Sequence, residues 1–336
     1  MTSVVEQRHW HPVSLASAVG EQPVAVQLLD EALVLWRDAQ GVVQAWADRC
    51  PHRGAALSMG CVRRVGSDAQ LECPYHGWRF AGSGQVAVVP ALPGFVPPAS
   101  HRATVFAAAE RYGLVWVRLA AEGEASPPAF AAEDEARLRK VNCGPYDVAT
   151  SAPRIVENFL DMAHFGFVHE GWLGDRGHTA VADYRVDITP TGFLATGCRA
   201  WQPQSSVHAQ GGADVDYTYE VNAPYTAVLT KVPDASTVAL ADFRESIALF
   251  ICPVSPERSR VWFRLAMNDF ESPDERLQAF QHTIFTQDQP VLESQRPRCL
   301  PVSTSSPVQE LHCAADRSAA AYRRHLRDLG ITFGTC

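Results

Sequence analysis

Two short segments rich in cysteine and histidine constrain this chain more than any other feature of its sequence. Cys50-Pro51-His52 supplies one thiol and one imidazole, and Cys73-Pro74-Tyr75-His76 supplies a second pair. Thiols and imidazoles are both metal ligands. Two tight loops that each carry one thiol and one imidazole can hold a small cluster between them. Gly54 and Gly77, with the prolines, let the backbone turn sharply beside the ligands. The sequence therefore predicts two loops that converge on one metal centre.

This ligand set favours a Rieske [2Fe–2S] cluster, in which two cysteines hold one iron and two histidines hold the other. A Cys₂His₂ zinc site is the alternative, but zinc fingers usually place a cysteine pair before a histidine pair, whereas each loop here carries one of each. Tyr75 and Trp78 either shield the cluster from water or pack the loops. Cys61 lies between the loops and fits no ligand spacing, so we expect a structural role for it.

A second candidate metal site lies in residues 158–169, where Asn158, Asp161, His164 and His169 follow one another. On a helix, Asp161 and His164 share one face, but His169 lies about 140° further round. The helix must loosen for both imidazoles to reach one metal, and Gly166 in the gap resists such a distortion least. Two imidazoles with one carboxylate from elsewhere form the facial triad of a non-haem Fe(II) oxygenase. Ordinary packing of an aromatic-rich helix is the alternative.

Charge and cysteine usage exclude several other classes of protein. The net charge of −8 argues against a nucleic-acid or anionic-membrane partner. Residues 1–8 contain no apolar core typical of a signal peptide, and the longest apolar runs, such as residues 247–254, are too short to span a bilayer. Nine cysteines, an odd number in no small-scaffold pattern, indicate reduced thiols and metal ligands. We therefore expect a cytoplasmic protein.

Apolar runs and turn residues divide the chain into an all-β first part and an α+β remainder. Strands are predicted at residues 24–29, 33–36, 42–46 and 114–119, and a hairpin joins 78–80 to 86–89. A change of composition over residues 120–128 predicts two domains, 1–120 and 121–336. The second domain is predicted to contain helices at 133–140, around His164, at about 273–294 and at 314–329. Its antiparallel strands are predicted at 182–188, 193–201, 217–221, 227–232, 246–254 and 260–266.

The two metal patterns in this order resemble the catalytic α subunit of Rieske non-haem iron oxygenases, from Trp10 to the end of the sequence. Residues 110–117 and 289–295 resemble the branch of monooxygenases and N- or O-demethylases. Within that branch, residues 169–176, 321–324 and 329–336 are similar to the saxitoxin-pathway Rieske hydroxylases, and purine N-demethylases are a looser match.

The resemblance implies an α+β protein, with an all-β Rieske [2Fe–2S] domain followed by a helix-grip antiparallel-sheet catalytic domain. It also implies a homotrimer and a separate reductase, of the flavin or ferredoxin type, that delivers electrons from NAD(P)H. The implied ligands of the [2Fe–2S] cluster are Cys50, His52, Cys73 and His76, and the implied ligands of Fe(II) are His164, His169 and Asp288. The family usually has a glutamate before the carboxylate ligand, whereas this chain has Gln287, so Glu293 is kept as the alternative carboxylate.

Asp161 and Asn158 are the further candidate catalytic residues. Asp161 is able to accept an N–H from His164, as metal-bound histidines usually require. In the family, the aspartate at this position bridges the cluster histidine of one subunit to the iron histidine of its neighbour; a solvated or capping aspartate is the alternative. Asn158 is expected near the iron without binding it.

The expected function is the terminal oxygenase component of a Rieske monooxygenase. Such an enzyme uses O₂ and reductase-supplied electrons to hydroxylate or oxidatively demethylate a small substrate, here a nitrogen-rich, alkaloid-like or aromatic one. A Rieske-type electron carrier is the alternative, but carriers are close in size to the first domain alone and lack the set His164, His169 and Asp288. The motifs leave the substrate, and the choice between hydroxylation and demethylation, open.

Overall fold

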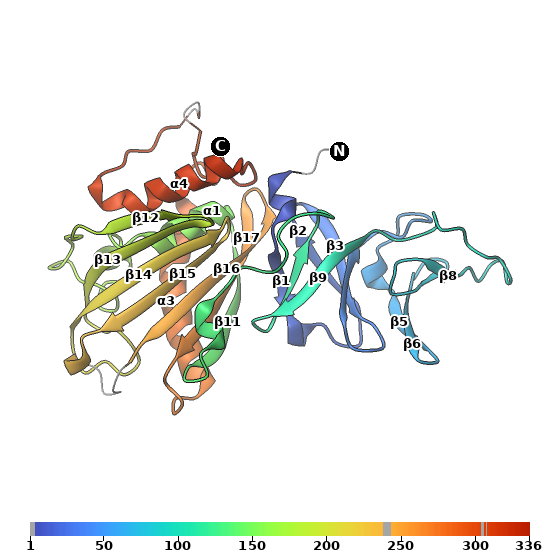
Figure 1. Cartoon of the computed structure of the whole chain (residues 1–336), viewed down its shortest axis with the longest axis horizontal. Coiled ribbons are helices and arrows are strands. Elements are labelled where there is room, and N and C mark those ends of the chain that lie inside the picture. The colour runs from blue at the N-terminus through green and yellow to red at the C-terminus, as the bar shows by residue number, and fades with distance from the viewer. Residues whose placement is uncertain (1–3, 238–242, 304–305, 307) are drawn as a thin grey trace. The chain divides into compact units, whose positions relative to one another are not determined.

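The chain folds into two compact units, Met1–Pro127 and Pro128–Cys336. The structure, a computed structural model, describes residues 4–237, 243–303, 306 and 308–336, and Figure 1 shows its elements. The mixture of two β-sheets in the first unit with one sheet and a few helices in the second confirms the predicted α+β class. The predicted domain ranges, 1–120 and 121–336, stay predictions. No helix among the described residues is long and apolar enough to cross a membrane.

The first unit contains a six-stranded and a four-stranded antiparallel sheet. The larger sheet has the order β1-β10-β9-β4-β3-β2 and the smaller one β5-β6-β7-β8. The larger sheet is made of β1 (His11–Leu15), β2 (Val24–Leu28), β3 (Glu31–Arg37), β4 (Val43–Ala47), β9 (Val105–Arg111) and β10 (Leu114–Arg118). The smaller sheet is made of β5 (Cys61–Val65), β6 (Asp68–Glu72), β7 (Arg79–Phe80) and β8 (Val86–Val88).

Aromatic side chains from both sheets fill the core beneath the two cysteine loops. The rings of Trp36 and Trp46 meet edge to face at 5.0 Å, and Phe80 of the smaller sheet stands 6.3 Å from Trp46. Cys50 and Cys73 belong to the same buried cluster, and both are at most 2% exposed. The cysteine loops therefore stand on a rigid apolar base that fixes the positions of the two thiols.

The second unit is built on a seven-stranded antiparallel sheet with the order β11-β17-β16-β15-β14-β13-β12. Its strands are β11 (Arg139–Val148), β12 (Arg185–Thr189), β13 (Gly192–Gln202), β14 (Ala213–Ala223), β15 (Thr226–Pro233), β16 (Glu245–Ser255) and β17 (Arg258–Met267). Its helices are α1 (Ala152–Leu160), α2 (Phe165–Val168), α3 (Asp274–Ser294) and α4 (Arg317–Leu329). Helix α3 contacts β11 and α1, α1 contacts β15 and β16, and α4 contacts β12 and β13 (Figure 1).

The helix predicted at residues 133–140 is wrong. A single 3₁₀ turn, Ala131–Asp134, is followed by strand β11, which begins at Arg139. Pairing with β17 buries Val141 and Cys143, which lie opposite Leu265 and Phe263. The burial of this alternating face in the sheet outweighs the helix propensity of the preceding polar residues. Strands β1, β5, β6 and β9 were not predicted either.

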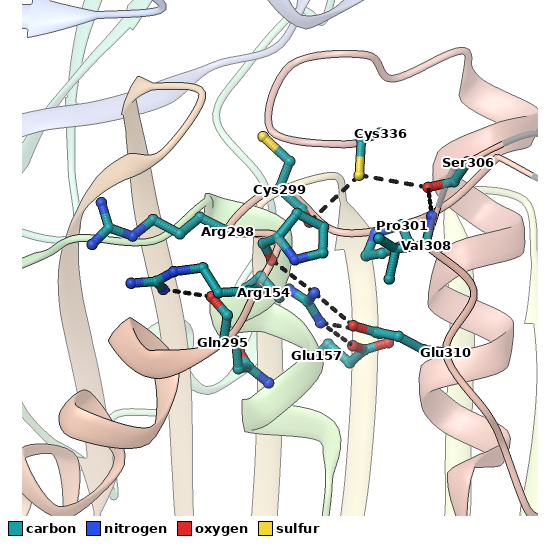
Figure 2. Close-up of polar contacts among 12 residues, drawn as sticks. Arg154, Glu157, Gln295, Arg298, Cys299, Pro301, Ser306, Val308, Glu310 and Cys336 are labelled. Atoms are coloured by element: carbon teal, nitrogen blue, oxygen red, sulfur yellow. Dashed lines mark hydrogen bonds and ion pairs between the residues drawn. The ribbon is translucent and has the colours of Figure 1, made fainter.

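A buried network of two arginines and two glutamates ties α1 to α4 and to the segment after α3. Arg154 of α1 donates to both oxygens of Glu310, at 2.7 and 3.1 Å (Figure 2). Arg323 of α4 donates to both oxygens of Glu157 on α1, at 2.6 and 2.7 Å, and also to Glu310. Because Arg154 is 2% exposed, the network holds α1 through desolvated, bidentate charge pairs.

The first prediction concerns the pH dependence of this network. Burial raises the pKa of Glu310, but hydrogen bonds from Arg154 and Arg323 outweigh it and hold the pKa below its ordinary value of 4.5. The stabilisation is therefore fully present above pH 4.5 and is lost as the pH falls through the lower folded pKa. At neutral pH, Glu310→Gln should lower the free energy of unfolding by roughly 2 kcal/mol, less than for a fully buried pair because Glu310 is 28% exposed.

Denaturant titrations between about pH 7 and pH 3 measure this effect. The difference between Glu310→Gln and the parent should shrink toward the acid end, because the unfolded state takes up a proton on Glu310 more readily than the folded state does. Glu275→Gln, at an exposed position of α3, is the control and should change little. A destabilisation by Glu310→Gln that stays constant across the whole range would contradict the prediction.

Candidate metal and substrate site

The two cysteine loops have the same backbone geometry, although their histidines stand at different positions. The N–H of Cys50 donates to the carbonyl of Ala55, and the N–H of Gly54 donates to the carbonyl of Cys50, both at 2.8 Å. In the second loop, Cys73 donates to Trp78 at 2.8 Å, and Gly77 donates to Cys73 at 3.1 Å. Both glycines adopt left-handed φ values, 73° and 67°, which other residues adopt only at a cost in conformational energy.

The side chains of the loops converge. The thiols of Cys50 and Cys73 are near enough to affect each other's ionisation, since Cys73 contributes to raising the pKa of Cys50, and the ring centroids of His52 and His76 lie 4.6 Å apart. Burial raises the pKa of the Cys50 thiol to about 11, whereas the backbone N–H groups of His52 and Arg53 hydrogen bond to it and oppose that rise. Trp78 stacks on the ring of His52 with centroids 4.5 Å apart and planes within 6° of parallel.

The donor set fits the predicted cluster. Nδ1 of His52 is a buried nitrogen without a hydrogen-bond partner among the described residues, an atom that a bound metal would satisfy. Two adjacent thiols, two adjacent imidazoles and amide N–H groups that face a sulfur match the needs of a [2Fe–2S] centre held by Cys₂His₂. The assignment of Cys50, His52, Cys73 and His76 as its ligands stays a prediction.

The segment from Leu160 to His169 is not one helix. Helix α1 ends at Leu160, and Asp161 follows it in an extended conformation with φ −90° and ψ 134°. The four-residue helix α2 then lies between His164 and His169. The expectation that Asp161 and His164 share a helix face, with the distortion at Gly166, is therefore wrong. The carboxylate of Asp161 accepts the N–H of Ala163 at 2.8 Å, a local turn that competes with the helix.

The break brings the two imidazoles together. Nε2 of His164 lies 3.2 Å from Nε2 of His169, and Oδ1 of Asp288 lies 3.4 Å and 3.2 Å from these two nitrogens. Ligands about 2.1 Å from one ion and roughly 90° apart are about 3 Å from each other, so the triangle suits a single metal. Among the described residues, His164, His169 and Asp288 form the one group of three or more such side chains close enough to share an ion.

The alternative carboxylate, Glu293, lies elsewhere. Its Oε1 accepts the N–H of Ala149 at 3.1 Å and the amide of Gln289 at 2.9 Å. Asn158 donates instead to Oδ1 of Asp288 at 3.3 Å, so it contacts the carboxylate of the triangle. The geometry therefore gathers Asp288 and not Glu293, and the roles of Asp288 and Asn158 toward iron stay predictions.

Each imidazole of the triangle has its second nitrogen fixed by a neighbour. Nδ1 of His164 is 3.0 Å from Oδ2 of Asp161, and Nδ1 of His169 is 2.8 Å from Oε1 of Gln287. Such contacts select the tautomer whose Nε2 is free to bind a metal. Gln287, which stands where the family usually has a glutamate, therefore makes a contact that the sequence did not predict. Its place next to the carboxylate ligand is the signal that could have suggested this contact.

Asp161 is ionised at neutral pH. Burial raises its pKa, but hydrogen bonds from His164 and from backbone N–H groups outweigh burial and lower the pKa. Its side chain is nevertheless 32% exposed, whereas those of His169 and Asp288 are 2% and 9% exposed. One face of Asp161 is therefore open to solvent while the triangle is enclosed.

The triangle opens on a cavity between α3 and strands β14 to β17. Its walls are mostly apolar and aromatic: Ile155, Phe159, Phe165, Leu173, Tyr217, Tyr219, Leu229, Ile247, Leu249, Phe263, Phe280, Ile284 and Phe285. The polar groups besides the triangle include Asn158, Lys231 and Gln281. A small apolar molecule with few polar groups suits such a cavity.

Two family models match the chain. Residues 9–102 match the Rieske [2Fe–2S] domain, and residues 148–330 match the vanillate O-demethylase oxygenase C-terminal domain. The second match covers more than half of the 336 residues and is to an oxygenase domain, which favours the oxygenase over the electron carrier.

Relatives match over nearly the whole chain. Methylxanthine N1-demethylase NdmA of Pseudomonas putida is 31% identical over 96% of this chain and 89% of its own length, and methylxanthine N3-demethylase NdmB is 32% identical over 97% and 90%. The solved structure of NdmB has a TM-score of 0.81 at 29% identity, covering 96% of this chain and 91% of its own. Oxidoreductase NdmD of Pseudomonas putida is 33% identical over 34% of this chain and 19% of its own length.

The second prediction separates the two carboxylates. Asp288→Ala should lose the mononuclear iron, because it removes one vertex of the triangle, while the visible spectrum of a [2Fe–2S] cluster persists. Glu293→Ala is the matched control on the same helix and should retain both metals. Iron per chain and absorption spectra measure the outcome. Full iron content in Asp288→Ala, together with loss in Glu293→Ala, would exchange the two assignments.

Proposed function

The chain belongs to the Rieske oxygenases, as a terminal oxygenase component, and we propose that it oxidatively demethylates a small neutral heterocycle. Members of this family carry a [2Fe–2S] cluster and a mononuclear iron and take electrons from a reductase, and this chain does so as well. The relatives NdmA and NdmB are methylxanthine N-demethylases by name, which supports demethylation over hydroxylation. The observation that carries the proposal is the apolar cavity that opens on His164, His169 and Asp288.

In this proposal Cys50, His52, Cys73 and His76 hold the cluster, and His164, His169 and Asp288 hold the iron. The metals supply single electrons and a site at which O₂ is reduced. Removal of one N-methyl group uses one O₂, two electrons and two protons, and yields the demethylated nitrogen, formaldehyde and water. Since this stoichiometry needs no further reactant, a reductase of the flavin or ferredoxin type fed by NAD(P)H is sufficient.

The chain's own side chains hold the metal ligands and the substrate. Asp161 and Gln287 fix the imidazoles, and Asn158 supports the carboxylate of Asp288. The aromatic walls exclude water and hold a flat ring by dispersion. The Gln281 amide is 9% exposed and makes no hydrogen bond to any described residue, which leaves it available to a polar group of the substrate. Besides the triangle, the cavity offers the neutral amides of Gln281 and Asn158 and an ammonium, Lys231, that Glu245 already compensates, which favours an uncharged molecule.

The proposal includes a homotrimer in which Asp161 links two subunits. Asp161 and His164 line a second, open cleft on the second unit, bordered by the exposed side chains of Leu311 and Val291. Exposed apolar groups beside a partly exposed carboxylate suit a surface that another copy of the chain covers. His76 of that copy would then approach Asp161, and electrons would pass from its cluster toward His164.

The third prediction tests the reaction. With a surrogate flavin–ferredoxin reductase and NAD(P)H, methylated purines such as caffeine and theobromine should stimulate O₂ uptake with one formaldehyde released per O₂ consumed. His164→Ala should abolish formaldehyde release yet keep a reducible cluster, because it changes only the second unit. A stable hydroxylated product without formaldehyde would replace demethylation by hydroxylation. O₂ uptake that no methylated heterocycle increases would contradict the proposed substrate class.

The fourth prediction concerns the carboxylate of Asp161. Asp161→Asn keeps the size but removes the charge, so both metals should remain while product formation falls by about 100-fold. Single turnover of the pre-reduced variant, with cluster oxidation followed beside product, is the measurement. Cluster oxidation and product formation at the parent's rate in Asp161→Asn would refute the link.

Mixed trimers test the crossing between subunits. A His76 variant and a His164 variant, each inactive alone, are combined under conditions that exchange subunits. Recovered activity would indicate that an intact cluster serves the iron of another chain. If verified mixed trimers stayed inactive, electrons would have to travel within one chain, and the subunit link would be wrong.

A further inference from the structure

A buried ion pair that the proposed mechanism does not use lies at the edge of the substrate cavity, which one of its two residues lines. Just two of the 29 lysine and arginine residues are lysines, Lys140 and Lys231, and Lys231 stands on β15 with 4% exposure. Its ammonium lies 2.7 Å from the carboxylate of Glu245, the residue opposite on β16. Burying two charges costs solvation energy that their attraction repays poorly, so the pair is weak as a stabilising device. A lysine instead of arginine offers a compact, adaptable donor.

The pair lies where two cavities meet. Tyr217, Lys231 and Glu245 are register partners across β14, β15 and β16, so their side chains share the sheet face on which the substrate cavity lies. Lys231 and Gln281 line both that cavity and a second, smaller one. Phe280 also lines both, and its ring centroid is 5.8 Å from the ammonium. These three residues therefore form a neck between the cavities.

Helix α3 gives the distance from this neck to the metal site. Gln281 precedes Asp288 by seven residues on the helix, which corresponds to about 10 Å at 1.5 Å per residue. A hydrogen bond between the neck and the substrate occupies about 2.9 Å of this distance along α3. The rest of the distance accommodates a ring system whose methyl group lies at the triangle and whose polar atom lies at the neck.

The ammonium has unused hydrogen-bonding capacity. It carries three N–H donors, and Glu245 is its hydrogen-bonding partner within the described ranges 4–237 and 243–303. Its side chain is 5% exposed and lines both cavities, so the other two donors face the cavities and not the bulk solvent. A buried donor without a partner costs free energy until a ligand supplies an acceptor.

We propose that Lys231, held by Glu245, donates a hydrogen bond to a carbonyl oxygen of the substrate and thereby sets which methyl group reaches the iron. This inference rests on the proposed function and narrows its substrate class to neutral heterocycles that carry an exocyclic carbonyl. A carbonyl suits the site better than a carboxylate, because Glu245 already compensates the ammonium. A third charge would leave the buried group with a net negative charge.

Calorimetric binding to the oxidised holoenzyme, without reductase, tests this role. The probes are caffeine, its 2-thio and 6-thio analogues, and the pair 1-methyl-2-quinolone and 1-methyl-2-quinolinethione, because sulfur accepts hydrogen bonds poorly. In at least one pair of an oxygen compound and its sulfur analogue, the parent protein should bind the oxygen compound about tenfold more tightly. The variant Lys231→Met/Glu245→Gln removes both charges together, so neither is left unpaired, and Lys140→Met is the matched control.

Equal affinity for the oxygen and sulfur compounds in the double variant, with the tenfold preference kept in Lys140→Met, would support the role of Lys231. A purely structural ion pair would lower all affinities alike, so a preference retained in the double variant would overturn the inference. Two other results would overturn the inference. One is that a protein with intact metal spectra binds none of the carbonyl probes. The other is that it binds 1-methylindole-3-carboxylate more tightly than the neutral carbonyl probes. Formaldehyde release reports on the proposed function separately, because binding is measured without turnover.

Discussion

The second unit depends on one constraint. Two histidines five residues apart and one aspartate from a distant helix must meet at a single point. A continuous helix would turn the imidazoles away from each other. The chain meets the constraint by ending α1 at Leu160, where the carboxylate of Asp161 offers the backbone a competing hydrogen bond. The same carboxylate fixes His164. One short acidic side chain thus both breaks the helix and orients the ligand that follows.

The third vertex depends on long-range packing. Asp288 stands on α3, which reaches α1 only because the seven-stranded sheet carries the chain back to it. The network of Arg154, Glu157, Glu310 and Arg323 holds α1 on the other side. Burying a charge network costs solvation free energy. Because these charge pairs can form in few alternative arrangements, the network restricts the position of α1. Fixing α1 and α3 keeps the edges of the triangle near 3.2–3.4 Å.

Residue patterns predicted much of this protein, and their failures have physical causes. Local spacing identified the cysteine loops, whose glycines and prolines encode the turns, and long apolar strands such as β16 were predicted within a residue or so. The helix expected at residues 133–140 failed because burial against β17 decides that segment, and sequence pattern does not contain its partner. Gln287 departs from the residue type usual in the family, yet its amide oxygen makes the contact that His169 needs, and residue identity alone does not reveal that contact.

The substrate cavity shows the limit of such patterns most clearly. Nothing near Lys231 in the sequence marks it as a pocket residue, because its polar partner Glu245 is on another strand and its neck partner Gln281 is on α3. The sheet register places Lys231 opposite both Tyr217 and Glu245, and α3 adds Gln281. Short motifs thus identify the cysteine loops and the two histidines, whereas the groups that line the substrate cavity come from distant strands and from α1 and α3. Relatives can therefore share the metal residues and still select different molecules through these register positions.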